Sequence, residues 1–231
     1  MERVVQPELL DELPARDPLA ARSRRDLQRL NLLMGHHRIM AKALSQAISG
    51  RSPHSLAELG AGGGELLLHV ARRLNGRWPH VEVTLVDRAD VFDSQTRGEF
   101  GALGWSTNVE VQDALSWLRH SQAGKCDVIV TNLFLHQCPD QDLAEMFRLA
   151  VNSAKILIAV EPRRGFLALL CSRFVGLVGC GAVTCYDAPV SVRAGFSGRE
   201  LSALWPDQKN WELSERRAGL FSHLFIARRK R

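Results

Sequence analysis

The sequence has no long apolar run, no paired-cysteine motif and only one tyrosine. No stretch of about 18 apolar residues is free of charge, so we expect no membrane span. The most apolar piece, residues 166–183, contains Arg173 and three glycines. The five cysteines form no Cys-x-x-Cys pair, which argues against a metal site and fits a reducing compartment. The first residues, acidic and proline-containing, lack an apolar signal core, so we expect a cytoplasmic protein.

Charge and aromatic content argue against nucleic acid as a partner. The net charge is +5, and the basic residues are scattered in short clusters typical of a solvated surface. A nucleic-acid-binding protein more often shows one basic face with interleaved aromatic residues. The length of 231 residues suits one domain with a small lid. We therefore expect a small-molecule partner, with a monomer and a homodimer both open.

A glycine-rich turn lies between an apolar run and a helical pattern. Residues 55–68 read SLAELGAGGGELLL, which predicts a strand, a turn and a helix start. Glycine lets a ligand approach the main chain, and the start of a helix favours an anionic group. A P-loop would need a lysine after the turn, and none follows. A dinucleotide fingerprint would need a third glycine where Glu65 stands.

Candidate strand ends recur along the chain at regular intervals. They lie at Gly60, Asp87, Asp113, Asn132 and Glu161, separated by 27, 26, 19 and 29 residues. Helical stretches between them give the rhythm of a doubly wound parallel sheet. Residues 211–217 and 220–227 predict a final hairpin, and two helices, from Asp17 and over about 34–48, precede the first strand.

The pattern Glu58-x-Gly60-x-Gly62-x-Gly64 resembles motif I of the class I S-adenosylmethionine-dependent methyltransferases. The small-molecule type, as in ubiquinone/menaquinone biosynthesis or polyketide pathways, is the most similar. The resemblance implies an α/β fold with a seven-stranded, mostly parallel, Rossmann-like sheet and S-adenosylmethionine as cofactor. It also implies an N-terminal arm and helical lid over residues 1–52. The cofactor-binding domain would then span residues 53–231, with a substrate cover at about 163–197.

By the same resemblance, the cofactor lies at the ends of the strands. Asp87 would hold the ribose, and Asp113 would accept from the adenine amino group. A helix cap is the alternative role for each aspartate. Further cofactor contacts are expected at Glu58, Gly60, Ala61, Gly62, Gly64, Arg88, Ala114 and Asn132.

Residues 132–139, NLFLHQCP, resemble motif IV of small-molecule methyltransferases. They lack the Asn/Asp-Pro-Pro-Tyr/Phe tetrad that marks many amino-directed DNA, RNA and protein methyltransferases. His136 in this segment is the candidate general base, because a reference pKa of about 6.5 suits proton acceptance near neutrality. A structural or cofactor-packing histidine is the alternative.

Residues 31–38, NLLMGHHR, loosely resemble a helix that precedes motif I in the same family. Met34, His37 and Arg38 would then face the cofactor or the substrate. The alternative is an amphipathic helix whose solvent-facing side is formed by His36, His37 and Arg38. Farther along the chain, Asp187 and Arg193 either pair with each other or contact the substrate.

The predicted function is methyl transfer from S-adenosylmethionine to a small molecule, with the hydroxyl of a phenolic, quinol or polyketide-like compound as the expected acceptor. Two other classes remain open. A nicotinamide-dependent oxidoreductase would share the sheet, and a non-catalytic partner protein would keep the methyltransferase fold.

Overall fold

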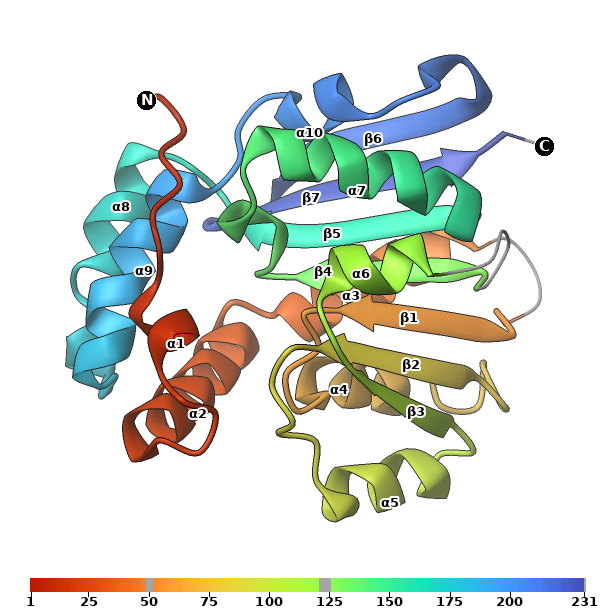
Figure 1. The fold of residues 1–231 in the computed structure, drawn as a ribbon, viewed down its shortest axis with the longest axis horizontal. Coiled ribbons are helices and arrows are strands. Elements are labelled where there is room, and N and C mark those ends of the chain that lie inside the picture. Colours follow the sequence, from red (N-terminus) through yellow and green to blue (C-terminus); the bar gives the residue numbers. More distant parts are fainter. Residues whose placement is uncertain (49–51, 121–125, 231) are drawn as a thin grey trace.

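The computed structural model describes residues 1–48, 52–120 and 126–230, and these form one seven-stranded sheet flanked by helices (Figure 1). The strands are β1 (Ser55–Leu59), β2 (Glu82–Asp87), β3 (Ser106–Val111), β4 (Val128–Asn132), β5 (Ile156–Pro162), β6 (Trp211–Ala218) and β7 (Ser222–Arg229). The α-helices are α1 (Leu9–Glu12), α2 (Pro18–Leu33), α3 (His36–Ala47), α4 (Glu65–Leu74), α5 (Ser94–Ala102), α6 (Ala114–Arg119), α7 (Asp140–Ser153), α8 (Phe166–Ser172), α9 (Ala182–Ala194) and α10 (Glu200–Leu204). Three 3₁₀ turns are η1 (Leu135–Gln137), η2 (Val175–Val178) and η3 (Gln208–Asn210).

The strand order is β3-β2-β1-β4-β5-β7-β6. Strands β1 to β5 run parallel, whereas β7 is antiparallel to both β5 and β6. The prediction of a doubly wound sheet closed by a hairpin is therefore confirmed. The order reverses between β1 and β4, and a crevice for ligands forms at such a point, beyond the carboxyl ends of the strands.

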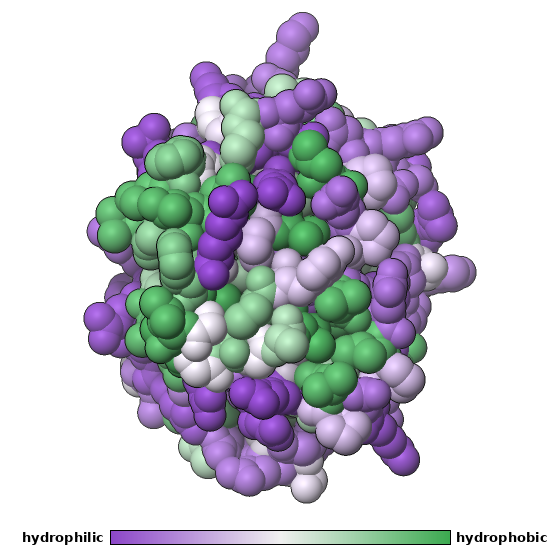
Figure 2. All heavy atoms as spheres, turned by 90° about the vertical axis from the view of Figure 1, so that its left-hand side faces the viewer, coloured by the Kyte–Doolittle hydropathy of each residue, from purple (hydrophilic) through white to green (hydrophobic). Residues whose placement is uncertain are grey.

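Four helices lie beyond those carboxyl ends, on the left of Figure 1: α1, α2, α8 and α9. The predicted start of α2 is confirmed, because the Asp17 carboxylate accepts the N–H of Leu19 at 2.7 Å and Pro18 occupies the first helical turn. The face that these helices present to solvent carries apolar side chains among hydrophilic ones (Figure 2).

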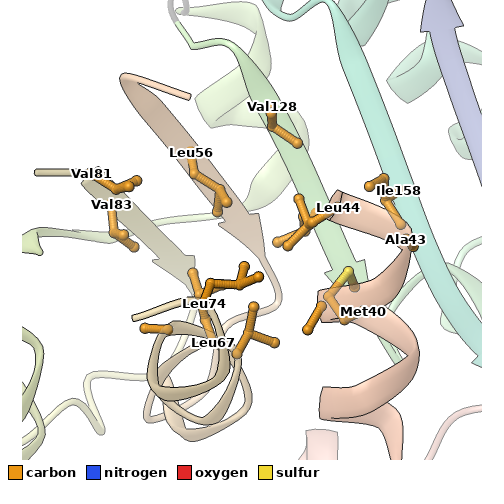
Figure 3. Packing of buried hydrophobic residues seen from close by; sticks show 14 of the residues in the cluster. Met40, Ala43, Leu44, Leu56, Leu67, Leu74, Val81, Val83, Val128 and Ile158 are labelled. Carbon is orange, nitrogen blue, oxygen red and sulfur yellow. The ribbon is translucent and has the colours of Figure 1, made fainter. Parts of the chain in front are cut away.

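Helices α3 and α4 pack on one face of the sheet (Figure 3). Met40 and Leu44 of α3 are fully buried against strand residues such as Leu56 and Ile158. On the other face, Phe147 of α7 lies 5.0 Å from the Trp205 ring, measured between centroids. Helix α3 is thus a layer of the core, and the part of residues 1–52 that lies over the strand ends is the arm with α1 and α2.

Two segments extend beyond what the sequence pattern indicates. The apolar pattern at residues 109–111 predicts only a short third strand, whereas β3 begins at Ser106, because its partly exposed edge position needs no continuous apolar run. The apolar stretch 166–183 contains α8 and η2, and α9 then continues through Pro189, which lacks an N–H for a helical bond. Because proline usually ends a helix, the sequence did not indicate that α9 is the longest helix of the predicted cover.

Candidate functional site

A pocket of about 600 Å³ lies at the carboxyl ends of β1, β2 and β4, between the sheet and the N-terminal arm with α2. Nine of the ten residues predicted to bind the cofactor line it: Glu58, Gly60, Ala61, Gly62, Asp87, Arg88, Asp113, Ala114 and Asn132. The tenth, Gly64, is not among the lining residues, because a side chain there would lie 2.9 Å from Leu85, beneath the turn. The strand-end pattern therefore brings these distant residues together as predicted.

Two glycines give the turn its shape. Gly60 has a φ of +70°, and a Cβ on it would lie 2.6 Å from the Phe134 ring. Gly62 has a φ of +54°, and a Cβ on it would meet no atom within 4 Å. The first glycine is thus required by packing, whereas the second leaves open space on the pocket side.

Asp87 anchors the glycine turn to the end of β2. Its Oδ2 accepts the N–H of Gly62 at 2.8 Å, and its Oδ1 accepts the N–H of Ala89 at 2.8 Å. Each carboxylate oxygen has a further lone pair, so the side chain can still accept from a ligand hydroxyl. Asp113 caps α6 by accepting the N–H of Ser116 at 3.1 Å, and it also lines the pocket. Asp113 therefore both caps α6 and lines the pocket.

Glu58 is a buried carboxyl group without a matching cation among the described residues. Its Oε2 is buried and accepts no hydrogen bond there, and the residue lines the pocket. Burial, and then the nearby carboxylates of Glu65 and Asp87, raise the pKa of Glu58 well above its usual range. Such a group fits a ligand that brings a positive charge or N–H donors.

Asn132, at the end of β4, forms hydrogen bonds with residues of α2 and α3. Its Oδ1 lies 2.7 Å from Nδ1 of His36, whose Nε2 lies 2.9 Å from Oγ of Ser222. Burial lowers the pKa of His36 to about 4, so the ring is neutral and tethers α3 to both strands. The Asn132 amide also donates to Oδ1 of Asn31 at 3.3 Å. His36 is therefore a structural residue.

The structure corrects the expectation that His136 is a free general base. Its Nδ1 lies 2.9 Å from Oε2 of Glu161, and its Nε2 lies 3.2 Å from Oε1 of Glu8. Burial opposes the charged form, but the hydrogen bonds to the two carboxylates outweigh it and raise the pKa of His136 to about 9. The ring is a buried imidazolium and is not among the pocket-lining residues, so it has no vacant nitrogen with which to accept a substrate proton.

The partner Glu8 belongs to the N-terminal arm, whose sequence shows no periodic pattern that would indicate this contact. Arg3, in the same arm, donates to the carbonyls of His136 and Cys138 at 3.1 and 2.7 Å. Asp187 of α9 accepts hydrogen bonds from the N–H groups of Leu9 and Leu10. Its carboxylate therefore holds the backbone of the arm, whereas the sequence suggested a pair with Arg193 or a contact with the substrate. The arm is thus held from both sides where it covers the pocket.

The lid residues divide into two groups. His37 lines the pocket, and its Nδ1 is buried without a hydrogen-bond partner among the described residues. Met34, Arg38 and Arg193 do not line it, and Met34 instead faces a second hollow beside Leu220. The turn at Gly35 separates Met34 from Arg38, and Arg193 lies in the last turn of α9. None of the three therefore has the place at the main pocket that His37 has.

Several lining residues had no signal in the sequence. Gln28 of α2 donates to Oε1 of Glu65 at 2.5 Å, and the His69 ring lies 5.9 Å from that of His37. Leu133 has a φ of +51°, a strained conformation for a branched side chain, directly after β4. Periodicity places His69 on the helix that follows the glycine turn, but nothing local indicates that it faces a ligand.

Comparisons with known proteins agree with this fold. Residues 56–155 match the family model described as methyltransferase domain. The plantazolicin methyltransferase BamL, solved with a triazolic desmethylPZN analog and SAH, aligns with a TM-score of 0.65 at 14% identity, over 96% of this chain and 93% of that one. No curated protein matches the sequence.

Two further structures align over most of this chain. An O-methyltransferase family protein from Burkholderia thailandensis aligns with a TM-score of 0.61 at 15% identity, over 93% of this chain and 61% of that one. The pyocyanin biosynthetic protein PhzM aligns with a TM-score of 0.56 at 14% identity, over 93% and 60%. The present chain spans about three fifths of the length of these two proteins.

The fold is that of the class I methyltransferases, and its pocket is built on the glycine turn and two strand-end aspartates. The matched segment runs from β1 to the residue before β5 and so contains every strand that borders the pocket. Residues 56–155 thus match a methyltransferase domain, and the chain as a whole has the fold of the class I methyltransferases.

Proposed function

We propose that the protein transfers the methyl group of S-adenosylmethionine to a small-molecule acceptor, namely the hydroxyl of a phenolic, quinol or polyketide-like compound. One observation carries this proposal: the pocket has two differently lined parts. Strand ends and the glycine turn line one part, and helices α1 to α4 line the other. The bound cofactor supplies an electrophilic methyl group, so the protein mainly has to position an acceptor in line, an effect worth about 7–11 kcal/mol in well-aligned reactions.

The first part of the pocket holds the cofactor in this proposal. Gly60, Ala61 and Gly62 admit its amino-acid end, and Glu58 receives its ammonium group. Asp87, with Arg88 beside it, binds the ribose, while Asp113 and Ala114 border the adenine. Asn132 supports the methionine end. The orphaned Oε2 of Glu58 and the open space beside Gly62 support this arrangement.

Glu58 makes the affinity for S-adenosylhomocysteine dependent on pH. Its raised pKa means that the carboxyl group must lose a proton to pair with the ligand's ammonium group. We expect the affinity to rise with pH below that pKa by up to about tenfold per unit, and we expect Glu58→Gln to remove the dependence. Titration calorimetry across pH measures both. The exposed Glu82→Gln is the matched control, and an unchanged pH dependence in Glu58→Gln would refute the role.

The second part of the pocket combines apolar and polar side chains. Its lining includes Leu10, Leu13, Leu27 and Leu32 together with polar groups such as Gln28 and Asn31. Apolar walls with hydrogen-bonding groups between them are typical of small-molecule sites and suit an acceptor that carries a hydroxyl group. His37 offers an unpartnered ring nitrogen in this part. Burial, and then the cationic side chains around it, lower the pKa of His37, so the ring is neutral near pH 7 and can accept a hydroxyl proton.

Methyl transfer to a panel of phenols and quinols tests the proposal, and His37→Phe tests the proton acceptor. We expect this variant to bind S-adenosylhomocysteine normally but to turn over hydroxyl acceptors about 100-fold more slowly, the usual contribution of a general base. The exposed His54→Phe is its control. Undiminished turnover in His37→Phe would contradict the assignment.

Other outcomes of the same panel decide between function classes. Cofactor binding without turnover on any acceptor would favour the non-catalytic partner protein. Salt-sensitive methylation of RNA or DNA would contradict a small-molecule substrate. The aligned structures support the proposal, since they include an O-methyltransferase family protein and a pyocyanin biosynthetic protein.

A further inference from the structure

Large apolar side chains stand exposed on the segment between β5 and α9. They belong to α8, to η2 and to the turn between them. We call them, together with Arg173, the α8–η2 surface. Their exposed fractions are 82% for Phe166, 53% for Leu167, 42% for Leu170, 54% for Phe174, 84% for Leu177 and 59% for Val178. Figure 2 looks onto the side of the molecule that carries these helices and shows apolar side chains gathered there.

Helix α8 buries its small residues and exposes its large apolar ones, the reverse of what is expected for a helix that faces solvent. Ala168 and Ser172 are both 6% exposed and face the protein, whereas Phe166, Leu167 and Leu170 face outward. Fully burying a leucine or phenylalanine stabilises a protein by about 1.5–3 kcal/mol, and this helix forgoes that gain. Exposed apolar groups in such number mark a surface that contacts something else.

The charges around this surface have one sign. Between Pro162 and Tyr186 the sequence has three arginines and no acidic residue. Arg164 is buried in bonds to Glu200 and backbone carbonyls, but Arg173 is exposed beside Phe174. Arg22 of α2 extends over Gly181 at the far end of η2. The nearest acid there, Asp26, is buried and accepts the N–H of Gly181.

We propose that the α8–η2 surface docks on an anionic phospholipid bilayer, with its apolar side chains among the lipid headgroups and Arg173 paired with lipid phosphates. An interfacial helix of this kind combines apolar anchors with basic residues and does not span the membrane. In the described residues no helix is both long and apolar enough for a span. The inference rests on this surface alone and does not depend on the identity of the methyl acceptor.

A second copy of the chain fits the same surface less well. A symmetric dimer through this surface would bring the Arg173 side chains of both copies into one interface, and the segment has no acid to pair with either. Docking would also bring lipid close to the pocket cover, since α9 follows η2 directly and Asp187 of α9 holds the arm through Leu9 and Leu10. Lipid-soluble molecules would then arrive beside the arm that walls the pocket.

Vesicle flotation of the full chain tests the proposal. We expect the protein to float with vesicles in which about a third of the lipid is phosphatidylglycerol and to stay unbound with pure phosphatidylcholine vesicles. Phe166→Ser and Leu177→Ser should each lower the partition coefficient about tenfold or more. Arg173→Glu should lower it about tenfold, because it removes an attractive charge and adds a repulsive one. Val111→Ser, at the sheet edge formed by β3, and Arg77→Glu are the matched controls.

The proposal would be overturned if the parent protein floated with neither vesicle, or if the surface variants and controls floated alike. It would also be overturned if Leu177→Ser converted a dimer into a monomer, measured by light scattering, without changing flotation. Calorimetry with S-adenosylhomocysteine accompanies each variant. Unchanged cofactor binding separates loss of docking from misfolding, and failure to dock leaves the proposed methyl transfer untouched.

Discussion

Replacing Gly62 with arginine is expected to abolish cofactor binding while the protein remains folded. The Gly62 Cβ position is open toward the pocket, so a long cationic side chain would occupy the space proposed for the amino-acid end of the cofactor. It would also place a charge near the ligand's own ammonium group. We expect the affinity for S-adenosylhomocysteine to fall at least about 100-fold, or about 2.7 kcal/mol, measured by titration calorimetry.

Gly76→Arg is the matched control for this substitution. Gly76 has a φ of +80° and open space around its Cβ position, but it follows α4 and is not among the pocket-lining residues. Both variants therefore carry a similar left-handed strain of about 1–2 kcal/mol, and only Gly62→Arg should lose the ligand. Equal binding by Gly62→Arg and the parent protein would remove the glycine turn from the cofactor site.

His136→Ala is expected to destabilise the protein strongly. The substitution leaves the carboxylates of Glu161 and Glu8 buried without their shared cation, a change that typically costs about 3–5 kcal/mol. Urea denaturation at pH 7 measures the loss. His120→Ala, at an exposed helix end, should change the free energy of unfolding by less than about 0.5 kcal/mol. A similar small effect at His136 would mean that the two ion pairs contribute little.

The same residue predicts how stability depends on pH. The pKa of His136 is about 9 in the folded protein and about 6.5 when unfolded. The stabilisation is therefore fully present below pH 6.5 and is lost as the pH rises through 9, on the order of 3 kcal/mol in total. In His136→Ala this loss between pH 7 and 9 should disappear. Measurements stay below pH 9, because burial raises the pKa of the Cys138 thiol to about 12 and adds a further loss above it.

The parallel sheet was predictable because each buried strand is a short apolar run that ends in a polar or glycine residue. Val128–Asn132 is buried along its length, and its residues are apolar through Val130, before Thr131 and Asn132 at the end that reaches the crevice. The carboxyl ends of such strands meet at one edge. Residues as far apart as Gly60 and Asp113 could therefore be assigned to one pocket from the strand pattern together with the resemblance to the family.

The N-terminal arm was not predictable in the same way. Glu8 and His136 are 128 residues apart, and the arm has no periodic pattern that would indicate a partner. The His136 ring was expected to be vacant because the local sequence shows neither carboxylate beside it. The exposure of the apolar side of α8 was also not predictable, because an apolar helix is expected to face the core. Only the packing of the folded chain shows that Ala168 and Ser172 face inward.

Calorimetry of the parent protein with S-adenosylhomocysteine, S-adenosylmethionine and NADH tests most directly whether the pocket at the glycine turn serves a methyl donor. The account predicts one-to-one binding of both sulfur nucleosides and no binding of NADH. Asp87→Ala should weaken both nucleosides, because it frees the Gly62 N–H and removes the group proposed to hold the ribose. Tight NADH binding without either sulfur nucleoside, or parental affinity in Asp87→Ala, would contradict it.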